Sequence, residues 1–410
     1  MKVLFVSTLY HPHGIGGAEA TVRLLAEAAV RAGDDVAVAT LAPRGAALTR
    51  DEAGVRVHEV PLFNLFFPYP WPRKQTWRTP GWHMLDAWNP VMARRLMALV
   101  AREAPHVVHV HNLLGFSAAI WPALARHGVP VVQTLHDHYV ACVNSLMFRS
   151  SGNCAARCLR CRVACTPRRI ASRRVDVVTA VSRRLLDRVT GFGLFEGIGP
   201  RLVIPNPNAL PPAMPRSAPD PARPLRVGFL GRVEPIKGPE ILLEAARRIG
   251  PGRIELRLGG AARPDHLAAL QARFAGPGVA FLGPVEPAAF LATIDLLVVP
   301  SLVEEAAGRV VHEAFGFGVP VIGSAIGGIP EQIREGATGF LVPPGDVDAL
   351  ERRLRQLLDA PPDWAAMAEA CRAEAERHGV EAILAATRAA WAQAIAAHAA
   401  RPGWRWRPAA

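Results

Sequence analysis

Residues 300–324 read PSLVEEAAGRVVHEAFGFGVPVIGS, which predicts a loop, a helix and then a strand. Gly308 marks the expected start of the helix, so Glu305 lies in the loop and Glu313, eight residues later, lies inside the helix. Two glutamates on a helix surface are the plain alternative. Apolar and small residues surround Glu313, however, and an unpaired carboxylate is costly among them. The stretch therefore indicates two carboxylates with a role in a site.

Strands alternate with helices on both sides of this stretch. The C-terminal half contains the β-rich runs LRVGFLG, IDLLVVP and GVPVIGS, and the N-terminal half contains KVLFVST, DVAVATL, HVVHVHN and VPVVQTLH. Such alternation predicts right-handed βαβ units. We therefore expect an α/β protein with two doubly wound, Rossmann-like domains that face each other across a cleft, where a ligand would bind at the carboxyl ends of the strands.

A proline-rich segment divides the chain. Residues 205–224 contain too much proline for regular structure and predict the interdomain linker. We expect the N-terminal domain over residues 1–204, with a cysteine-rich insertion at about 138–166, and the C-terminal domain over residues 225–378. Residues 379–410 are expected to form a helix that packs back on the N-terminal domain, followed by a basic tail.

Composition agrees with a globular protein. The 410 residues are 50% hydrophobic and 20% charged, and at roughly 100 to 200 residues per domain they also suggest two domains. No apolar run reaches the roughly 18 to 20 residues of a membrane span, and the N-terminus has no signal-peptide cleavage site. We therefore expect a cytoplasmic protein that is at most peripheral to the inner face of the membrane. The net charge of +12 is spread along the chain, so we expect no nucleic-acid partner.

A second motif, GFLGRVEPIKGPE, follows the first strand of the C-terminal domain. Gly231 and Arg232 end that strand, and Lys237 comes just before a helix that begins at Pro239. Basic groups beside glycines at the carboxyl end of a strand suit a diphosphate. Only three of the 47 basic residues are lysines, so we expect Lys237 to be present for its chemistry.

The first turn of the N-terminal domain, HPHGIGGAE, is similar to a dinucleotide-binding turn. It departs from that pattern because Glu19 stands where the third glycine belongs, and because no acidic residue ends the second strand. Gly16 and Gly17 therefore indicate only that the backbone comes close to a bound phosphate or sugar.

Polar side chains follow two other strands of the N-terminal domain. His111 follows one strand, and His136 and Asp137 follow the next. A structural role is open for any single histidine, but the pair His111 and His136 indicates a site because adjacent strands end at one crevice.

A long segment between Phe63 and Trp88 interrupts the alternation. It is rich in aromatic residues, including Trp71 and Trp77, and these are interleaved with prolines and basic residues. Two interpretations are open. The segment is either an aromatic plug packed on its own domain or a surface that binds an acceptor or a membrane.

Together these motifs resemble those of the retaining glycosyltransferases of family 4, and the resemblance covers nearly the whole chain. It is carried by the stretch at residues 300–324 and by GIGGAE, HVVHVHN, TLHDHY, GRVEPIKG, GGIPEQI and GATGFLVPPGD. The resemblance implies the two-domain glycosyltransferase-B fold. A cysteine-rich insertion after TLHDHY is similar to that of one subgroup of the family.

The resemblance also implies roles for single residues. The first glutamate of the family's Glu-x7-Glu pattern, here Glu305, contacts the donor sugar, and the second, here Glu313, contacts the ribose. The basic pair Arg232 and Lys237 would contact the diphosphate, and the strand-end histidine would be His111. The family usually has Pro-Phe-Gly or Gly-Phe-Gly after the first glutamate, whereas this chain has Ala-Ala-Gly, which leaves a smaller loop beside the sugar.

The cysteine-rich insertion contains the run CAARCLRCRVAC, with Cys154, Cys158, Cys161 and Cys165. These spacings can fold four thiolates around one structural zinc ion. Thiols without a metal are the alternative. An iron–sulfur cluster is disfavoured because Arg160, and not an aromatic residue, precedes the third cysteine, and because the motif lies in the middle of a doubly wound domain.

The expected activity is transfer of a sugar from a nucleotide-diphosphate donor to the hydroxyl of a saccharide or lipid-linked acceptor, in polysaccharide or glycolipid synthesis. No cofactor is expected for catalysis. The expected catalytic residues are Glu305, His111, Arg232 and Lys237. Gly16, Gly17, Gly231, Gly308 and Glu313 complete the donor-binding set, and the acceptor side is expected to contain His136, Asp137, Trp71 and Trp77. A nucleotide-sugar epimerase or hydrolase on the same fold is the alternative.

Overall fold

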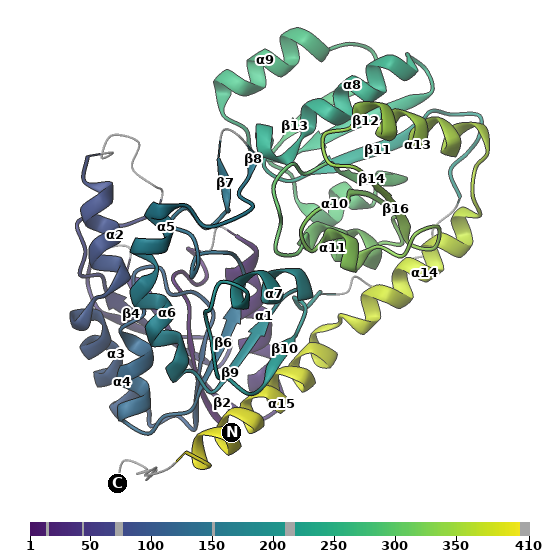
Figure 1. Cartoon of the computed structure of the whole chain (residues 1–410). Helices are drawn as coiled ribbons and strands as arrows, with labels where there is room; N and C mark the ends of the chain where they lie inside the picture. The colour runs from purple at the N-terminus through teal and green to yellow at the C-terminus, as the bar shows by residue number, and fades with distance from the viewer. Residues whose placement is uncertain (14–15, 43–44, 70–76, 150–151, 210–217, 402–410) are drawn as a thin grey trace. The chain divides into compact units, whose positions relative to one another are not determined.

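The computed structural model describes residues 1–13, 16–42, 45–69, 77–149, 152–209 and 218–401 (Figure 1). The chain divides into two compact units. The N-terminal unit contains residues 1–149, residues 154–207 and the chain from Val380 onward. The C-terminal unit contains residues 208–379 and the short segment that ends at Asn153.

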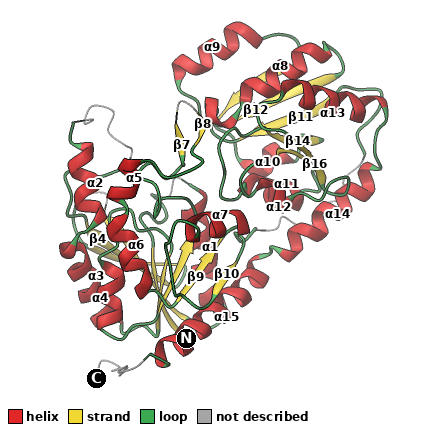
Figure 2. Cartoon of the chain, viewed as in Figure 1, coloured by secondary structure: helices red, strands yellow, loops and turns green. Residues whose placement is uncertain are grey.

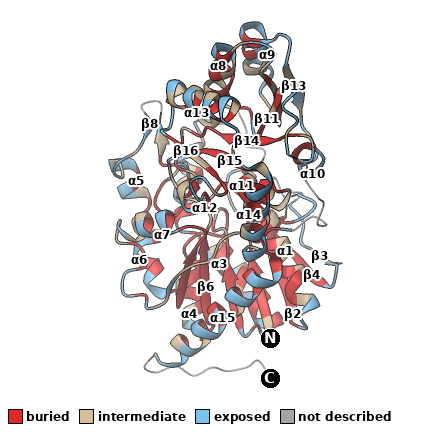
Figure 3. Cartoon of the chain, turned by 90° about the vertical axis from the view of Figure 1, so that its right-hand side faces the viewer, coloured by how far each residue is buried: buried red, intermediate tan, exposed pale blue. Residues whose placement is uncertain are grey.

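The N-terminal unit is built on a sheet with the strand order β10-β9-β6-β5-β1-β2-β4-β3. Neighbouring strands are parallel, except that β3 runs antiparallel to β4. The central strands are near-continuous apolar runs because helices cover both faces of a parallel sheet (Figure 3). The strands are β1 (Lys2–Val6), β2 (Asp35–Ala42), β3 (Leu48–Glu52), β4 (Val55–Pro61), β5 (Val107–Val110), β6 (Val131–Leu135), β9 (Val177–Ala180) and β10 (Arg201–Val203).

Helices α1 and α15 pack together on one face of this sheet, and α3 and α4 pack together elsewhere on it (Figures 1 and 2). The insertion also contains the small hairpin of β7 (Phe148–Arg149) and β8 (Gly152–Asn153), of which β8 belongs to the segment grouped with the C-terminal unit. The helices are α1 (Gly17–Arg31), α2 (Thr79–Ala87), α3 (Pro90–Glu103), α4 (Ile120–Arg126), α5 (Leu159–Ala164), α6 (Thr166–Ala171), the 3-10 helix η1 (Ser172–Arg174), α7 (Arg183–Thr190) and α15 (Val380–Ala399).

Helix α15 is part of the core of the N-terminal unit. Ile383, Leu384 and Trp391 are buried with residues of β1 and α1. The Trp391 indole donates a hydrogen bond to Nδ1 of His109 at 3.1 Å, and its ring packs edge-on against Phe5. The last long helix is therefore fixed to a sheet whose first strand begins at residue 2.

The C-terminal unit has a second parallel sheet, with the strand order β13-β12-β11-β14-β15-β16. The direction of the strand order changes between β11 and β14, and a change of this kind leaves a crevice at the carboxyl ends of the two strands. The strands are β11 (Leu225–Leu230), β12 (Ile254–Gly259), β13 (Val279–Gly283), β14 (Leu296–Val299), β15 (Val321–Ser324) and β16 (Gly339–Val342).

Two apolar clusters hold the helices of this unit on its sheet. One joins α8 and α13 to β11 and β12, and the other joins α10, α11, α12 and α14 to β14 and β15. The helices are the 3-10 helix η2 (Pro235–Lys237), α8 (Pro239–Ile249), α9 (Pro264–Phe274), α10 (Pro287–Leu291), α11 (Arg309–Gly316), α12 (Ile329–Gln332), α13 (Val347–Asp359) and α14 (Trp364–Arg377).

The predicted fold class is confirmed, because each unit is an α/β layer structure around a parallel sheet. Three strands of the N-terminal sheet were not predicted: β3, a short edge strand with a mostly exposed pattern, the buried β9, and the short β10. Part of the predicted linker is described: Asn208 is buried in the C-terminal unit, where its side-chain amide donates to the carbonyl of His312 at 2.7 Å. Residues 210–217 of that linker lie outside the described residues. No described helix is long and apolar enough to span a membrane.

Candidate functional site

Two loops of the C-terminal unit meet at the carboxyl ends of β11 and β14. Gly238, which follows η2, has a φ of +68°, and a Cβ atom there would lie 2.1 Å from the carbonyl oxygen of Pro300. Only glycine permits so close an approach in the left-handed region. The N–H of Leu302 then donates to the carbonyl of Ile236 at 2.9 Å, which ties the loop after β14 to η2.

This approach brings two of the predicted residues together. The Lys237 ammonium lies 2.8 Å from Oε2 of Glu305. The Ser301 hydroxyl donates a hydrogen bond to the other carboxylate oxygen of Glu305. The carboxylate is therefore held from both sides. The sequence analysis did not identify Ser301, and its position four residues before Glu305 was the only available signal.

The loop that carries Glu305 is also fixed from the segment after β15. A Cβ atom on Gly327 would lie 2.3 Å from the Glu305 carbonyl oxygen, which accepts a hydrogen bond from the N–H of Gly328 at 2.8 Å. Gln332 holds Gly308 at the start of α11: its Oε1 accepts from the N–H of Gly308 at 3.0 Å, and its Nε2 donates to the carbonyl of Gly308 at 3.2 Å. Gln332 belongs to the motif GGIPEQI, and sequence spacing gave no sign of this contact.

Glu313 and Arg232 each pair with a residue of their own segment. Glu313 lies on α11, as predicted, but the expectation of an apolar environment is wrong: its side chain is 25% exposed and pairs with Arg309 at 2.9 Å, one turn earlier. Neighbours in a helical sequence point in different directions, and the buried side chains are those beside Glu313 in the chain. Arg232 is exposed at the end of β11 and pairs with Glu234 at 3.1 Å.

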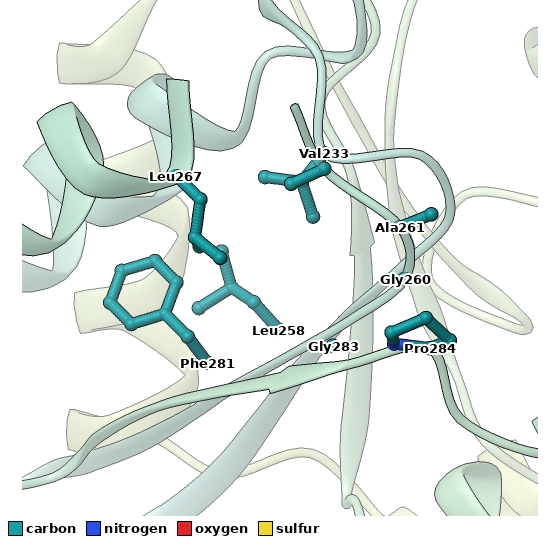
Figure 4. Close-up of a pocket in the computed structure, with 9 residues that line it drawn as sticks. Val233, Leu258, Gly260, Ala261, Leu267, Phe281, Gly283 and Pro284 are labelled. Atoms are coloured by element: carbon teal, nitrogen blue, oxygen red, sulfur yellow. The ribbon is translucent and has the colours of Figure 1, made fainter. Parts of the chain in front are cut away.

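A small pocket lies at the carboxyl ends of β11, β12 and β13. It has a volume of about 160 Å³, and Figure 4 shows Leu267 and Phe281 opposite Ala261 and Pro284. One of the residues that line the pocket is Val233, which directly follows Arg232 in the chain. Gly260, which lines the pocket, permits the backbones after β11 and β12 to approach closely, because a Cβ atom there would lie 1.8 Å from the carbonyl oxygen of Gly231. The pocket is apolar apart from backbone groups, so it suits a flat apolar face.

In the N-terminal unit, the predicted pair of histidines is in contact. Nδ1 of His111, after β5, lies 2.8 Å from Nε2 of His136, after the neighbouring β6. Burial lowers the pKa of His111 well below its ordinary value, and the nearby His109 and His136 lower it further. His111 is therefore neutral, and one ring nitrogen of the pair donates to the other. His109 lies behind them and is fixed by Trp391 and Thr134.

Two carboxyl groups lie near the same end of the N-terminal sheet. The pKa of Asp137 is raised to about 6, mainly by burial and also by the charge of Glu19, while the N–H of Tyr139 opposes the shift by donating to Asp137 at 2.7 Å. Glu19 folds back over the start of α1, where the N–H groups of Gly16 and of Glu19 itself stabilise its carboxylate. Its own pKa is nevertheless raised by burial. The turn at Gly16 and Gly17 thus already holds a carboxylate where a phosphate was expected.

Part of the aromatic segment is buried in the N-terminal unit, and part of it is exposed to solvent. Trp82 is fully buried, donates to the carbonyl of Phe66 at 2.9 Å and stacks on the Phe66 ring. Trp77, in contrast, is 81% exposed. Burial raises the pKa of Tyr69, and the charges of Glu19 and Asp137 raise it further, which places this end of the segment near both carboxyl groups. Trp71 lies outside the described residues.

The cysteines form a cluster that differs from the predicted tetrad. Sγ of Cys161 lies 3.7 Å from Sγ of Cys142, and Cys154 and Cys158 pack against the same buried cluster. Cys165 lies apart from this contact, with its sulfur 3.6 Å from the Arg168 guanidinium. Among the residues that the structure describes, no group of three or more His, Cys, Asp and Glu side chains is arranged to hold a metal. These four thiols are therefore not arranged around one ion in the part of the chain that the structure describes, and zinc binding by them stays a prediction.

Comparisons with known proteins agree with this architecture. Residues 16–207 match the family model described as "Glycosyl transferase 4-like domain", and residues 224–360 match "Glycosyl transferases group 1". A D-inositol 3-phosphate glycosyltransferase from Thermobispora bispora is 30% identical over 314 residues, which cover 70% of this chain and 71% of that protein.

Two other similarities extend over most of the chain. An uncharacterized 42.6 kDa protein in the cps region of Klebsiella pneumoniae is 26% identical over 338 residues, which cover 82% of this chain and 88% of that protein. The structure of a sucrose-phosphate synthase from Thermosynechococcus elongatus has a TM-score of 0.75 at 22% identity, over 96% of this chain and 99% of the other.

The raised pKa of Asp137 predicts a pH-dependent stability. Because the folded pKa of about 6 exceeds the ordinary 3.8, the protonated form favours folding, and this contribution is lost as the pH rises through 6. We therefore expect Asp137→Asn to gain free energy of unfolding relative to the native chain as the pH rises from 4 to about 7.5. Denaturation at several pH values measures this difference. Asp187→Asn, at an exposed position on α7, is the control that should show no such trend, and a constant difference for Asp137→Asn would contradict the assignment.

Zinc binding by Cys154, Cys158, Cys161 and Cys165 stays a prediction. We expect about one zinc per chain after purification without chelators, measured by elemental analysis, because thiolates at these spacings can enclose one ion. Cys165→Ser is the informative variant, because Cys165 lies beside Arg168 in this structure and the variant should lose zinc only if all four thiols bind the ion. Absence of zinc together with four rapidly titrating thiols would refute the prediction.

Proposed function

The chain belongs to the glycosyl transferases group 1 family, and from that premise we propose that it transfers a sugar from a nucleotide-diphosphate donor to an acceptor hydroxyl with retention of the anomeric configuration. The observation that carries the proposal is the contact between Lys237 and Glu305 at the carboxyl ends of β11 and β14. A cation and a carboxylate held there are suited to a ligand that has both a diphosphate and a sugar.

Donor binding would exchange the partners of this ion pair. A diphosphate carries more charge than the Glu305 carboxylate and would draw the Lys237 ammonium toward itself. Glu305 would then be left to accept hydrogen bonds from the sugar hydroxyls, with Ser301 still donating to it. In the chain without donor, Lys237 and Glu305 neutralise each other, so that neither charge is left without a partner in a half-buried loop.

The leaving diphosphate would be stabilised mainly by side-chain cations. The N–H of Gly308 is bound by Gln332, so Lys237 and Arg232 would supply most of the positive charge where negative charge develops. With donor bound, Glu305 would accept hydrogen bonds from Ser301 and from the sugar hydroxyls, which disfavours a role as covalent nucleophile. We therefore favour a front-face route, in which the departing phosphate oxygen takes the proton of the acceptor hydroxyl.

The pocket beside Arg232 would take the base of the nucleotide. Its apolar walls at Leu267 and Phe281 suit the face of a planar base, and the backbone groups near Gly260 suit its polar edge. A nucleotide placed there would direct its diphosphate toward the segment from Arg232 to Lys237, which follows the same strand.

The N-terminal unit would bind the acceptor. His111, His136 and Asp137 lie together at the ends of β5 and β6, and Trp77 adds an exposed aromatic surface. The neutral His111 ring and the His136 ring beside it offer both donor and acceptor nitrogens to sugar hydroxyls. The similarity to a protein in a cps region favours a saccharide or lipid-linked acceptor in polysaccharide or glycolipid synthesis, at the inner face of the membrane.

We expect Lys237→Ala and Glu313→Ala each to weaken donor binding by roughly 1.5 to 3 kcal/mol, because each removes a charge-assisted hydrogen bond. Thermal-shift or calorimetric titration with a panel of nucleotide sugars measures the affinity. Arg253→Ala is the control, since Arg253 forms an exposed pair with Asp359 in the same unit. Unchanged donor affinity in both variants would overturn the donor assignment, and donor consumption without any acceptor would indicate an epimerase or hydrolase.

We expect Trp77→Ala to leave the melting temperature and donor binding nearly unchanged but to reduce transfer to the native acceptor strongly, because Trp77 is exposed and has little packing to lose. The matched control is Trp82→Ala, which removes a fully buried ring and should cost about 3 to 5 kcal/mol of stability. If activity in Trp77→Ala only follows the folded fraction, the acceptor must be sought at His111 and His136.

A further inference from the structure

A groove lies between α2 and the helices of the cysteine-rich insertion, α5 and α6. Its volume is about 660 Å³, and most of its lining is apolar, including Pro80 and Met84 on α2 and Val143 and Val163 on the insertion. Among the lining residues are also Arg160 and His83. The groove belongs wholly to the N-terminal unit, and its α2 wall lies within the aromatic segment between Phe63 and Trp88.

The apolar edges of the groove are exposed. Met84 on one wall is 76% exposed and Val163 on the other is 66% exposed. Leu159 lies one turn before Val163 on α5 and is 75% exposed, and Ile170 on α6 is 61% exposed. Large apolar side chains gathered in this way on adjacent short helices mark a surface that another apolar body covers.

The same helices are strongly basic. Between Cys154 and Val175 the sequence has seven arginines and no acidic residue. Figure 3 shows α5 and α6 with much exposed surface. Five of the arginines are exposed: Arg160 and Arg162 on α5, Arg169 on α6, and Arg173 and Arg174 on η1, where Arg173 pairs with Glu196. Apolar side chains between arginines on short helices are the pattern of a segment that lies in the plane of an anionic membrane surface.

The walls of the groove are fixed to each other. Arg168 on α6 is buried and donates to Oδ2 of Asp86 on α2 at 3.1 Å, and it also donates to the Tyr139 hydroxyl at 2.8 Å. The N–H of Gly115 donates to the other oxygen of Asp86 at 2.6 Å. This network holds α6 against α2, so the groove is formed before any ligand arrives, and little ordering cost is left for binding.

We propose that α2, α5 and α6 form a docking surface for anionic phospholipids of a bilayer. The groove takes a hydrocarbon chain between Met84 and Val163, and the exposed arginines pair with lipid phosphates. This role goes beyond sugar transfer and does not depend on it. The surface would keep the acceptor-binding unit at the membrane, where lipid-linked saccharides are found.

Co-sedimentation of the full chain with vesicles tests the proposal. We expect binding to vesicles of phosphatidylcholine mixed with phosphatidylglycerol, much weaker binding to phosphatidylcholine alone, and weakening by salt. The double variant Leu159→Glu with Val163→Glu should lower the partition coefficient at least about tenfold, and Met84→Glu on the opposite wall should lower it as well. Arg160→Ser with Arg162→Ser should lower it about thirtyfold.

Matched controls separate this surface from general effects. Arg183→Ser with Arg184→Ser removes the same charge from exposed positions on α7, and Leu282→Glu adds a charge at an exposed apolar position on β13; both should bind vesicles as the native chain does. Absence of binding to anionic vesicles, equal loss in the control variants, or dimerisation through this face seen by light scattering would overturn the proposal. Melting temperatures verify folding, and nucleotide-sugar titration of the same variants tests the proposed function separately.

Discussion

The close approach of two backbones, after β11 and after β14, is the constraint on which the site of the C-terminal unit depends. A side chain at Gly238 would collide with the carbonyl of Pro300, so the loops can meet only with glycine there. Their meeting places Lys237 within 2.8 Å of Glu305, and the bond between Leu302 and Ile236 fixes the distance. The strand order changes direction between β11 and β14, and these parallel strands end at the same edge of the sheet. The backbone geometry at this edge thus brings the two charged side chains together.

The site of the N-terminal unit depends instead on burial. Trp391 donates to Nδ1 of His109, so the proton of that ring must be on Nε2, which donates to the Thr134 hydroxyl. His109 thereby becomes a fixed neutral ring, and His111 lies against it with the ring centroids 4.1 Å apart. Burial behind α15 therefore keeps His111 neutral and oriented toward His136. In this way Trp391 of α15 fixes which nitrogen of His109 carries the proton, and the burial of the same region keeps His111 neutral.

The sequence predicted what depends on local pattern and missed what depends on distant contacts. Apolar runs between turn signals predicted both sheets. The close approach of Gly238 to Pro300 was not predicted, because the glycines of that motif indicated only a site for a diphosphate. The contact of Gln332 with Gly308 joins residues 24 positions apart, and no periodicity links them. Glu313 was expected in an apolar environment because its sequence neighbours are apolar, yet a helix directs those neighbours elsewhere. The cysteine spacing predicted a group of Cys154, Cys158, Cys161 and Cys165. The chain between residues 142 and 161 instead folds so that Cys142 contacts Cys161.

The choice of lysine at position 237 follows from the exchange that the site must perform. Arginine stands at nearly all other basic positions, and its planar fork would form two parallel hydrogen bonds with the Glu305 carboxylate. Such a bidentate pair is specific in geometry and hard to open. The lysine ammonium is a compact charge on a flexible stem, with three donors that can rotate. It can keep one contact with Glu305 while it turns toward a phosphate, so charge balance is maintained at every stage of donor binding. Lysine therefore suits a position whose side chain must exchange one ionic partner for another, although arginine is used at most other basic positions of this chain.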